Sequence, residues 1–410
     1  MTGPPIQRPS QMDISRWLLI GSLYVSQYVG QAFLLISLIT IMRRQGLPME
    51  KLGLVYSLAL CWVFKFVWSP VIDRYNPICG RYKGWILITQ LGMALSLLAL
   101  SLCRLPTDFY LSLGLGCFHS FFSSTQDVAS DGLCRTLLLP GERPAGMSVQ
   151  AFSGLLGNII GGGVVLAAFP GLGWSGCCLL LAGVIMVSFF QCLFLNDPPR
   201  RTAYSVIPMN RLIDFWKINN NLSWLAFLVP YSIGIGLGWG LLPVLLADLK
   251  WGFGQIGFTL NVAGSLTGMI GAALSGLILK RIGRARMLKL TSAVVILGLL
   301  AISAIVGSTA DKGKVFLVVQ IYFLCVSPCV VVIPTLMMDR SSADSPATDY
   351  SVQFCLATLC QYLAASVGTM AGPRLGFGLA FLFCALVGTL TLLFGLKCIH
   401  KGVLVLKAAE

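Results

Sequence analysis

The chain has 410 residues, of which 56% are hydrophobic and only 11% are charged, with a formal net charge of +14 and a mean hydropathy of +0.83. Soluble domains carry about 25% charged residues, so this composition excludes a soluble protein and predicts one that lies in a membrane. The positive charge alone would fit a nucleic-acid partner, but its distribution between apolar segments argues against one.

Apolar runs of about 20 residues recur along the whole chain, and each is long enough to cross a hydrocarbon core of roughly 30 Å as a helix. In chain order, we predict about twelve transmembrane helices, at residues 17–40, 52–72, 84–103, 109–131, 146–169, 174–195, 223–246, 254–279, 286–308, 315–338, 347–371 and 375–399. The first sixteen residues are polar and lack the apolar centre and cleavage site of a signal peptide, so we expect the first helix to be retained.

The distribution of basic residues predicts the orientation of these helices. With the N-terminus inside, 20 of the 29 Lys and Arg residues fall in cytoplasmic segments and 8 fall in outside loops, while Lys65 lies within a span. Basic loops stay on the cytoplasmic side during insertion, so we predict that both termini are cytoplasmic. The net positive charge is then explained by topology and by contact with anionic lipid rather than by nucleic acid.

A polar segment near the middle of the chain divides it into two parts. Residues 196–222 contain basic residues and prolines that keep them out of the bilayer, and we expect a cytoplasmic linker there. We therefore predict two six-helix bundles, at residues 17–195 and 223–399, with cytoplasmic tails at residues 1–16 and 400–410.

The two halves repeat weakly in sequence. "PAGMSVQ" ends at Gln150 and "PATDYSVQ" ends at Gln353, which places the two glutamines 203 residues apart. The dipeptides Gly80-Arg81 and Gly283-Arg284 keep the same offset. Internal duplication of membrane bundles is typical of secondary transporters, which move one half against the other around a site near the bilayer midplane.

Charged turns follow the second and eighth predicted helices. The first turn, "DRYNPICGRYK", begins at Asp73, and the second, within "GLILKRIGRAR", has Lys280 where the acid would be. With twelve helices, a basic central linker and these two turns, the chain resembles the major facilitator superfamily, whose usual signature is G-x-x-x-D-R-x-G-R-R/K. The resemblance implies an all-α fold of two pseudo-symmetric six-helix bundles. The cytoplasmic gate is expected at Asp73, Arg74, Arg81, Arg281 and Arg284.

Four ionisable residues lie within the predicted helices or just below the cytoplasmic surface: Lys65, Asp127, Asp131 and Arg135. Each would cost about 2.5–3.5 kcal/mol at the bilayer centre, so they should face one another or water. Spacing by four places the last three on one helix face, at a depth that allows Lys65 to pair with either aspartate. Two hypotheses remain open, namely a carboxylate that exchanges a proton during transport and a static ion pair at the inner gate.

Neutral polar and aromatic residues at membrane depth form a second group. The first predicted helix carries Gln27 and Gln31 on one stripe, and the resemblance implies that the first, fourth, seventh and tenth helices line the substrate cavity. Ordinary interhelical hydrogen bonding is the alternative for any single member. The candidate cavity residues are Gln27, Gln31, Gln126, Asn158, Tyr231, Trp239 and Tyr322.

The sequence contains no motif that is typical of a metal site or of an enzyme active site. The 14 Cys are scattered through the spans without C-x-x-C or Cys/His ligand spacing, and the two His residues are far apart. We therefore expect no metal site, no cofactor and no disulfide framework. A phosphate-binding loop and a nucleophile–base arrangement are also missing from the sequence, so we expect a protein that is neither an ATP-driven pump nor an enzyme.

The first half narrows the resemblance. "WVFKFVWSPVIDRY", residues 62–75, and "STQDVASDG", residues 124–132, are similar to the branch that holds the AmpG muropeptide permeases, the acetyl-coenzyme A transporters and the RhtX/FptX siderophore importers. AmpG-type proteins are usually longer, so the length of this chain favours the RhtX/FptX group.

That resemblance implies a monomeric, proton-driven importer of a siderophore or ferric-siderophore across a bacterial inner membrane, in which iron is only part of the carried chelate. An AmpG-like muropeptide permease and an acyl-coenzyme A-type anion transporter are the alternatives. An aromatic cavity with few charges would suit an aryl-capped chelate, and an Arg-lined cavity would suit a ligand that bears phosphate.

Overall fold

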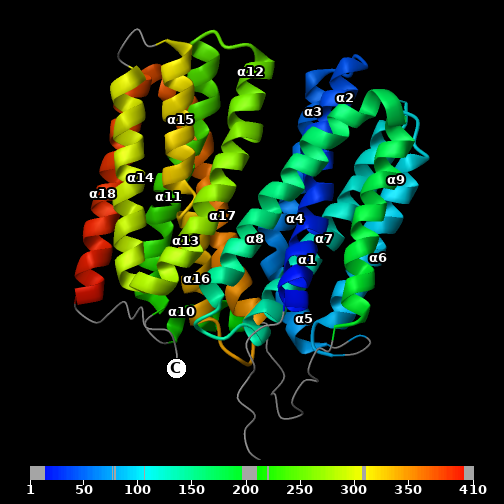
Figure 1. Ribbon diagram of the computed structural model, residues 1–410, viewed down its shortest axis with the longest axis horizontal. Coiled ribbons are helices and arrows are strands. Elements are labelled where there is room, and N and C mark those ends of the chain that lie inside the picture. The colour runs from blue at the N-terminus through cyan, green and yellow to red at the C-terminus, as the bar shows by residue number, and fades with distance from the viewer. Residues whose placement is uncertain are drawn as a thin grey trace, which may run out of the picture.

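The computed structural model describes residues 14–75, 77, 80–105, 107–195, 210–218, 221–306 and 311–400, and every regular element in these ranges is helical. The helices stand in two upright bundles side by side, coloured blue to green and green to red (Figure 1). Helix α1 begins and α18 ends at the same end of the molecule, as both termini on one side of a membrane require (Figure 1). The predicted fold class is confirmed.

The first bundle is built from the following elements: α1 (Ile14–Ala32), η1 (Phe33–Leu38), α2 (Ile39–Arg44), α3 (Met49–Val55), η2 (Tyr56–Ala59), α4 (Leu60–Phe64), η3 (Lys65–Val67), α5 (Ser69–Arg74), α6 (Lys83–Ser101), α7 (Phe109–Leu137), α8 (Arg143–Asn158), η4 (Ile159–Val164) and α9 (Val165–Leu193). Two of these elements, η1 and η4, are π-helical turns, as is η5 of the second bundle, whereas η2 and η3 are 3-10 turns.

The second bundle contains the following elements: α10 (Arg211–Lys217), α11 (Asn221–Asp248), α12 (Phe253–Gly257), η5 (Phe258–Ala263), α13 (Gly264–Ile282), α14 (Arg284–Val306), α15 (Lys312–Val326), α16 (Cys329–Arg340), α17 (Pro346–Leu375) and α18 (Phe377–His400). Most of the predicted linker, the predicted N-terminal tail up to residue 13 and the C-terminal tail from residue 401 lie outside the described residues.

Each of the twelve predicted spans falls on helix, yet only nine stretches of the described chain are both long and apolar enough to cross a membrane. Four of the predicted spans account for the difference. The second is interrupted by η2 and η3, the fourth carries charged and polar side chains in α7, and the fifth and sixth run together into one stretch from Arg143 to Leu193. A break at Gly173, whose φ is 63°, separates these last two.

The predicted repeat is visible in the backbone. Gly80 and Gly283 have φ angles of 68° and 80°, and Gly173 and Gly376 have φ angles of 63° and 81°. Each pair is 203 residues apart, and only glycine adopts such left-handed conformations at little cost. Helices α8 and α17 also begin 203 residues apart, as do α7 and α15. The two bundles are therefore copies of one topology in the same register.

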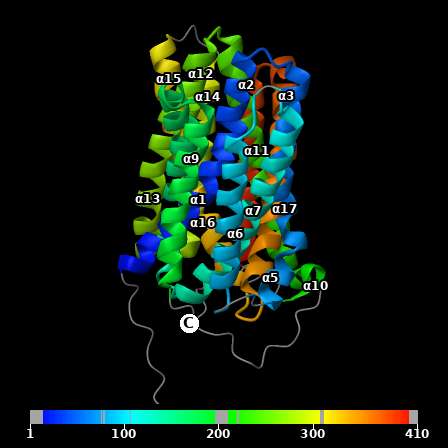
Figure 2. The same ribbon diagram turned by 90° about the vertical axis from the view of Figure 1, so that its right-hand side faces the viewer.

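Contacts between helices of the two bundles bring them together. Helix α8 of the first bundle packs on α13, and α17 of the second packs on α7, on α5 and on the broken segment around η3. Figure 2, turned by 90°, shows α17 beside α7 and α5 at the lower end of the molecule. The site described below lies along these contacts.

Within the second bundle, α11 and α17 approach so closely that glycine is required. A Cβ atom at Gly240 would collide with the backbone carbonyl of Ala365, whereas one at Gly234 of the same helix would make ordinary contacts, 3.6 Å from the Val387 side chain and 4.0 Å from the Gly388 nitrogen.

We therefore expect Gly240→Ala to force the two backbones apart and destabilise the protein by about 1–3 kcal/mol, as overpacking does in well-packed interiors. The matched substitution Gly234→Ala should change the melting temperature little. Thermal unfolding of the purified protein in detergent measures both, and equal melting temperatures for the two variants would contradict the assignment.

Candidate functional site

Lys65 is placed by an interruption of the second span. The 3-10 turn η3 lies between two residues with bridge-region dihedrals, Phe64 (φ −95°, ψ 3°) and Trp68 (φ −102°, ψ 0°). Pro70 follows in the first turn of α5, where a missing backbone N–H is tolerated. The turn packs against α7, and the Lys65 side chain is 0% exposed.

The Lys65 ammonium meets two carboxylates of α7, and these three residues form what we call the charge cluster. Its Nζ forms an ion pair with Asp127 and lies 3.8 Å from Oδ2 of Asp131. Both aspartates are buried, on the one helix face that the sequence predicted. Because an uncompensated buried charge costs several kcal/mol, the pair stabilises the fold only while all its members are satisfied.

Hydrogen bonds distinguish the two carboxylates. Gln27 Nε2 donates to Asp127 Oδ1 at 2.6 Å, and the Tyr24 hydroxyl donates to Asp131 Oδ1 at 2.8 Å. Gln150 Nε2 approaches the same Asp131 oxygen at 3.4 Å. Oδ2 of Asp131 has no hydrogen-bond partner among the described residues. The cluster therefore holds two acids for one base, with one acid oxygen unsatisfied.

Arg135, the third member of the α7 stripe, does not join the charge cluster. Its guanidinium reaches across to the other bundle, where Nε and one terminal nitrogen donate to the carbonyl of Ser341 at 3.1 and 2.9 Å. One helix face therefore carries the buried acids and, one turn further, a contact between the bundles.

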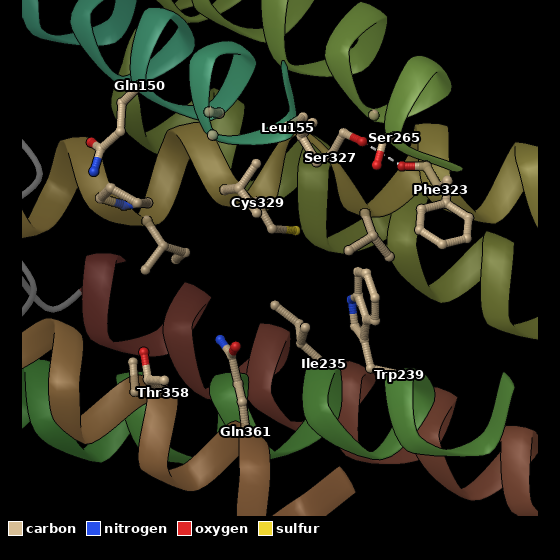
Figure 3. Close-up of a pocket in the computed structure, with 18 of the residues that line it drawn as sticks. Gln150, Leu155, Ile235, Trp239, Ser265, Phe323, Ser327, Cys329, Thr358 and Gln361 are labelled. Atoms are coloured by element: carbon tan, nitrogen blue, oxygen red, sulfur yellow. Dashed lines mark hydrogen bonds between the residues drawn. The ribbon is translucent and has the colours of Figure 1, made fainter. Parts of the chain in front are cut away.

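A cavity of about 430 Å³ lies between the bundles, next to the charge cluster (Figure 3). Figure 3 shows Gln361, Ile235 and Trp239 on one wall, and Gln150 and Cys329 on the other. Among the described residues, its lining contains amides, hydroxyls and aromatic rings but no Asp, Glu, Lys, Arg or His residue. Gln150 belongs to both places, because it lines the cavity and approaches Asp131.

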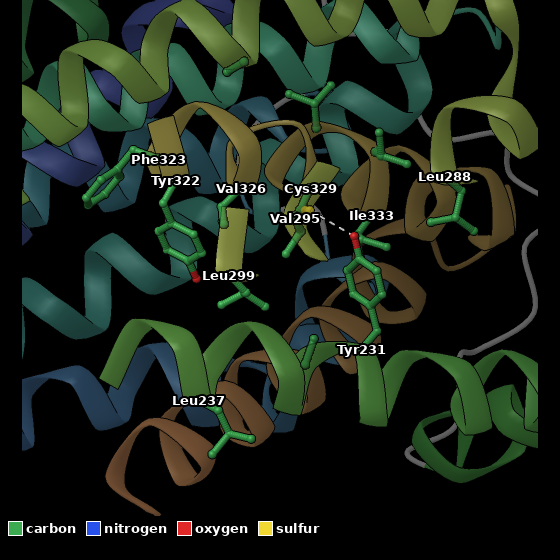
Figure 4. Close-up of a cluster of buried hydrophobic side chains, with 14 of the residues drawn as sticks. Tyr231, Leu237, Leu288, Val295, Leu299, Tyr322, Phe323, Val326, Cys329 and Ile333 are labelled. Atoms are coloured by element: carbon green, nitrogen blue, oxygen red, sulfur yellow. Dashed lines mark hydrogen bonds between the residues drawn. The ribbon is translucent and has the colours of Figure 1, made fainter. Parts of the chain in front are cut away.

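Three of the predicted cavity residues line it, namely Asn158, Tyr231 and Trp239. The other four lie elsewhere, because each is held by neighbours inside a bundle. Gln27 is bonded to Asp127, Gln126 Nε2 donates to the Leu23 carbonyl at 3.0 Å, and Gln31 Oε1 accepts from Trp62 at 3.1 Å. Tyr322 is 1% exposed within the hydrophobic core of the second bundle (Figure 4).

The sequence analysis missed several lining residues, above all Gln361 and Phe354 of α17. The repeat could have found the first, since Gln361 lies 203 residues after Asn158. No comparable sequence signal marks Phe354, because a phenylalanine in an apolar helix is unremarkable.

The predicted gate residue Asp73 connects the two bundles at the end that carries α5 and α10. Its Oδ2 accepts hydrogen bonds from the backbone N and the Oγ1 of Thr348, both at 2.7 Å, in the first turn of α17. The Tyr82 hydroxyl donates to Oδ1 at 2.6 Å. A carboxylate at a helix N-terminus is favoured by unpaired N–H groups and by the helix dipole.

Arginines complete this contact between the bundles. Arg81 donates to the carbonyls of Ala343 and Asp344, at 3.0 and 2.6 Å. Asp339 of the second bundle holds one arginine from each side, Arg143 of the first bundle at 2.6 Å and Arg284 of its own bundle at 3.0 Å.

The gate therefore differs in part from the predicted set. Arg74 and Arg281, assigned to it from the signature, are exposed at their helix ends. Arg143 and Asp339 were missed, because neither belongs to the signature turns.

The short helix α10 fastens the predicted linker to the same region. Arg211 donates to both carboxylate oxygens of Asp349, at 2.8 and 2.7 Å. These hydrogen bonds raise the pKa of Arg211 above its ordinary value, so its guanidinium stays charged throughout the physiological range.

Comparison with known proteins agrees with this architecture. A family model described as Major Facilitator Superfamily matches residues 20–369. The chain is 25% identical over 369 residues to the anhydromuropeptide permease of Escherichia coli (strain K12), which covers 86% of this chain and 74% of that protein. It is 22% identical over 353 residues to putative transporter AmpG 3 of Rickettsia prowazekii (strain Madrid E), covering 81% and 83%.

Solved structures share the fold at lower identity. The human organic anion transporter MFSD10 superposes with a TM-score of 0.74 at 15% identity, covering 94% of this chain and 100% of that one. A bacterial homologue of the iron transporter ferroportin, in its outward-facing state, gives 0.69 at 15% identity, covering 95% and 100%.

The charge cluster should respond to substitution as a unit. Lys65→Met leaves two buried acids without a cation, and we expect it to destabilise the protein by about 3–5 kcal/mol. The double variant Lys65→Met with Asp127→Asn should recover part of that loss, because only one acid remains. A thermal double-mutant cycle in detergent measures the coupling, and strictly additive effects would show that the pair is energetically unimportant.

Asp339 should control how firmly the bundles are joined at the gate. Asp339→Ala leaves two arginines facing each other without their shared carboxylate, so we expect the population open at this end to rise. Labelling of single cysteines placed along α8 and α13 by a membrane-impermeant reagent measures the change. Arg281→Ala, an exposed arginine of the same region, is the control, and equal labelling of both variants would contradict the role of Asp339.

Proposed function

Because the chain belongs to the Major Facilitator Superfamily, we propose that this multi-pass permease of the bacterial inner membrane imports anhydromuropeptides into the cytoplasm. The proposal is supported by relatives named as an anhydromuropeptide permease and as AmpG transporters, which match over four fifths of this chain. Anhydromuropeptides are amino sugars that carry a short peptide, so they offer many amides and hydroxyls.

The single observation that carries the proposal is the uncharged, amide-rich cavity between the bundles. Amide side chains from both bundles line it, namely Gln150 and Asn158 of the first and Asn261 and Gln361 of the second. An amide offers two donors and an acceptor, which suits acetamido groups and peptide bonds. Trp239 adds an aromatic face that can cover the apolar side of a sugar ring.

The competing substrates have less support. Siderophore import, which the sequence favoured, fits an aromatic cavity, but one relative is named an anhydromuropeptide permease and two are named putative AmpG transporters, and none of these three names refers to a siderophore. An acyl-coenzyme A carries several phosphate charges, and the part of the chain that the structure describes places no Arg or Lys in the cavity lining to bind them.

Proton coupling is assigned to Asp131 rather than to Asp127. Asp127 is neutralised by Lys65 and bonded to Gln27, whereas Asp131 keeps an unsatisfied Oδ2 in a fully buried position. A buried site with two acids and one base is electrically balanced when one acid carries a proton. Protonated Asp131 leaves the Lys65–Asp127 pair neutral, and Gln150 connects it to the cavity.

Transport then follows from alternating access. In the arrangement closed at the gate, the cavity takes up substrate and Asp131 holds a proton. Movement of one bundle against the other opens the gate, and both are released on the cytoplasmic side.

The test is uptake by proteoliposomes with an imposed pH gradient, acidic outside. Labelled anhydromuropeptide should accumulate, whereas a labelled ferric-siderophore should not, and the reverse result would favour the siderophore reading. Asp131→Asn, which mimics the protonated acid, should lose accumulation driven by the gradient but keep exchange of substrate between the two sides. Asp214→Asn removes an exposed carboxylate of α10 and serves as the control. Gradient-driven accumulation by Asp131→Asn would overturn its role in coupling.

A further inference from the structure

We propose that Phe354 of α17 is a lid that separates the charge cluster of the first bundle from the substrate cavity, so that a proton passes from the cavity to Asp131 only when bound substrate displaces the ring. This inference rests on the proton coupling proposed above. It leaves Asp131 as the proton carrier and adds a barrier in front of it, formed by a residue that has no charge and belongs to the other bundle.

The position of Phe354 between two sites is the first observation. Its ring centroid lies 4.4 Å from Nζ of Lys65, close enough for a cation–π contact. The same residue lines the cavity. Lys65 and Asp131 are both 0% exposed, although a cavity of about 430 Å³ lies next to them. A large apolar side chain therefore stands where water would otherwise reach the cluster.

Two further residues of α17 contribute to the cover, beside Tyr24 and Gln27 of α1 and Gln150 of α8. The Tyr350 ring stacks on that of Phe354, with centroids 6.0 Å apart and planes at 17°, and Cys355 Sγ contacts the Trp62 carbonyl at 3.7 Å.

The titratable groups that surround the cluster come from three helices, α1, α7 and α17. They are Tyr24, Tyr28, Cys134, Tyr350 and Cys355. Tyrosine and cysteine side chains are ordinarily neutral at physiological pH, so none of these groups forms a charged barrier to protons beside the Phe354 ring.

The repeat supplies a second, independent observation. The residue 203 positions before Phe354, at the equivalent place of α8, is Ala151. The equivalents of Asp127 and Asp131 in the second bundle are Val330 and Pro334. Helix α8, which packs against the bundle that lacks the two carboxylates, has an alanine at this position. Helix α17, which packs against the bundle that has them, carries a phenylalanine. Packing alone would not require this difference.

The lid is mechanically tied to the gate. Phe354 lies six residues after Thr348, roughly 9 Å along the same helix, and Thr348 is the residue that binds Asp73. A movement that withdraws the start of α17 from Asp73 also withdraws the ring from Lys65. Opening the gate therefore opens the cluster to water in the same step.

The experiment measures proton entry into proteoliposomes that contain a pH-sensitive dye, with an acidic exterior and no substrate. The wild-type protein should be tight without substrate and admit protons when anhydromuropeptide is added. Phe354→Ala should leak without substrate, and Phe354→Val serves the same test if the alanine variant does not reconstitute. Phe354→Leu keeps an apolar side chain of similar reach and should stay tight.

Phe323→Ala is the matched control, because Phe323 also lines the cavity but packs against Trp239, with ring centroids 5.4 Å apart. It should change substrate uptake without a leak. A tight Phe354→Ala, or an equal leak from Phe323→Ala, overturns the lid while the proposed function stands. Wild-type protein that accumulates substrate without proton entry overturns the proposed coupling, and the lid with it.

Discussion

The constraint on which the structure depends is the burial of one ammonium with two carboxylates. Lys65, Asp127 and Asp131 are removed from water inside a bundle that otherwise consists of apolar helices. Such charges are tolerated only when every partner is in place, so the surrounding hydrogen bonds from Tyr24 and Gln27 are fixed by the same requirement. The turn η3 interrupts the second span at Lys65, the residue whose ammonium is buried inside the bundle.

Duplication gives the protein two equivalent halves, and function depends on where they differ. The first half keeps the charge cluster and Asp73, whereas the second half contributes Asp339 to the contact between the bundles. The second half offers Val330 and Pro334 where the carboxylates would be, and both line the cavity. The first copy of the repeat therefore holds the charge cluster, and the second provides most of the neutral lining of the cavity. Gln150 connects the two, because it lines the cavity and approaches Asp131.

The sequence predicted the helices, the repeat and the pairing of Lys65 with α7, because hydropathy, glycine offsets and helical spacing are local signals. It did not predict which polar residues face the cavity. Gln27 and Asn158 are equally polar at similar depth, and only the neighbours in space decide that one bonds Asp127 and the other faces the cavity. Arg143 and Asp339 were missed for the same reason, since they are 196 residues apart and belong to no motif.

The two spans that carry the charge cluster are also two that fail the test of length and hydropathy for membrane crossing. An isolated α7 would bring two aspartates into the lipid, each at a cost of roughly 2.5–3.5 kcal/mol when central. Lys65 lowers that cost only if its own segment is already in the bilayer. The contact that we propose to serve transport would thus also favour an order of biogenesis, in which the fourth helix leaves the translocon only after the second is there to receive it.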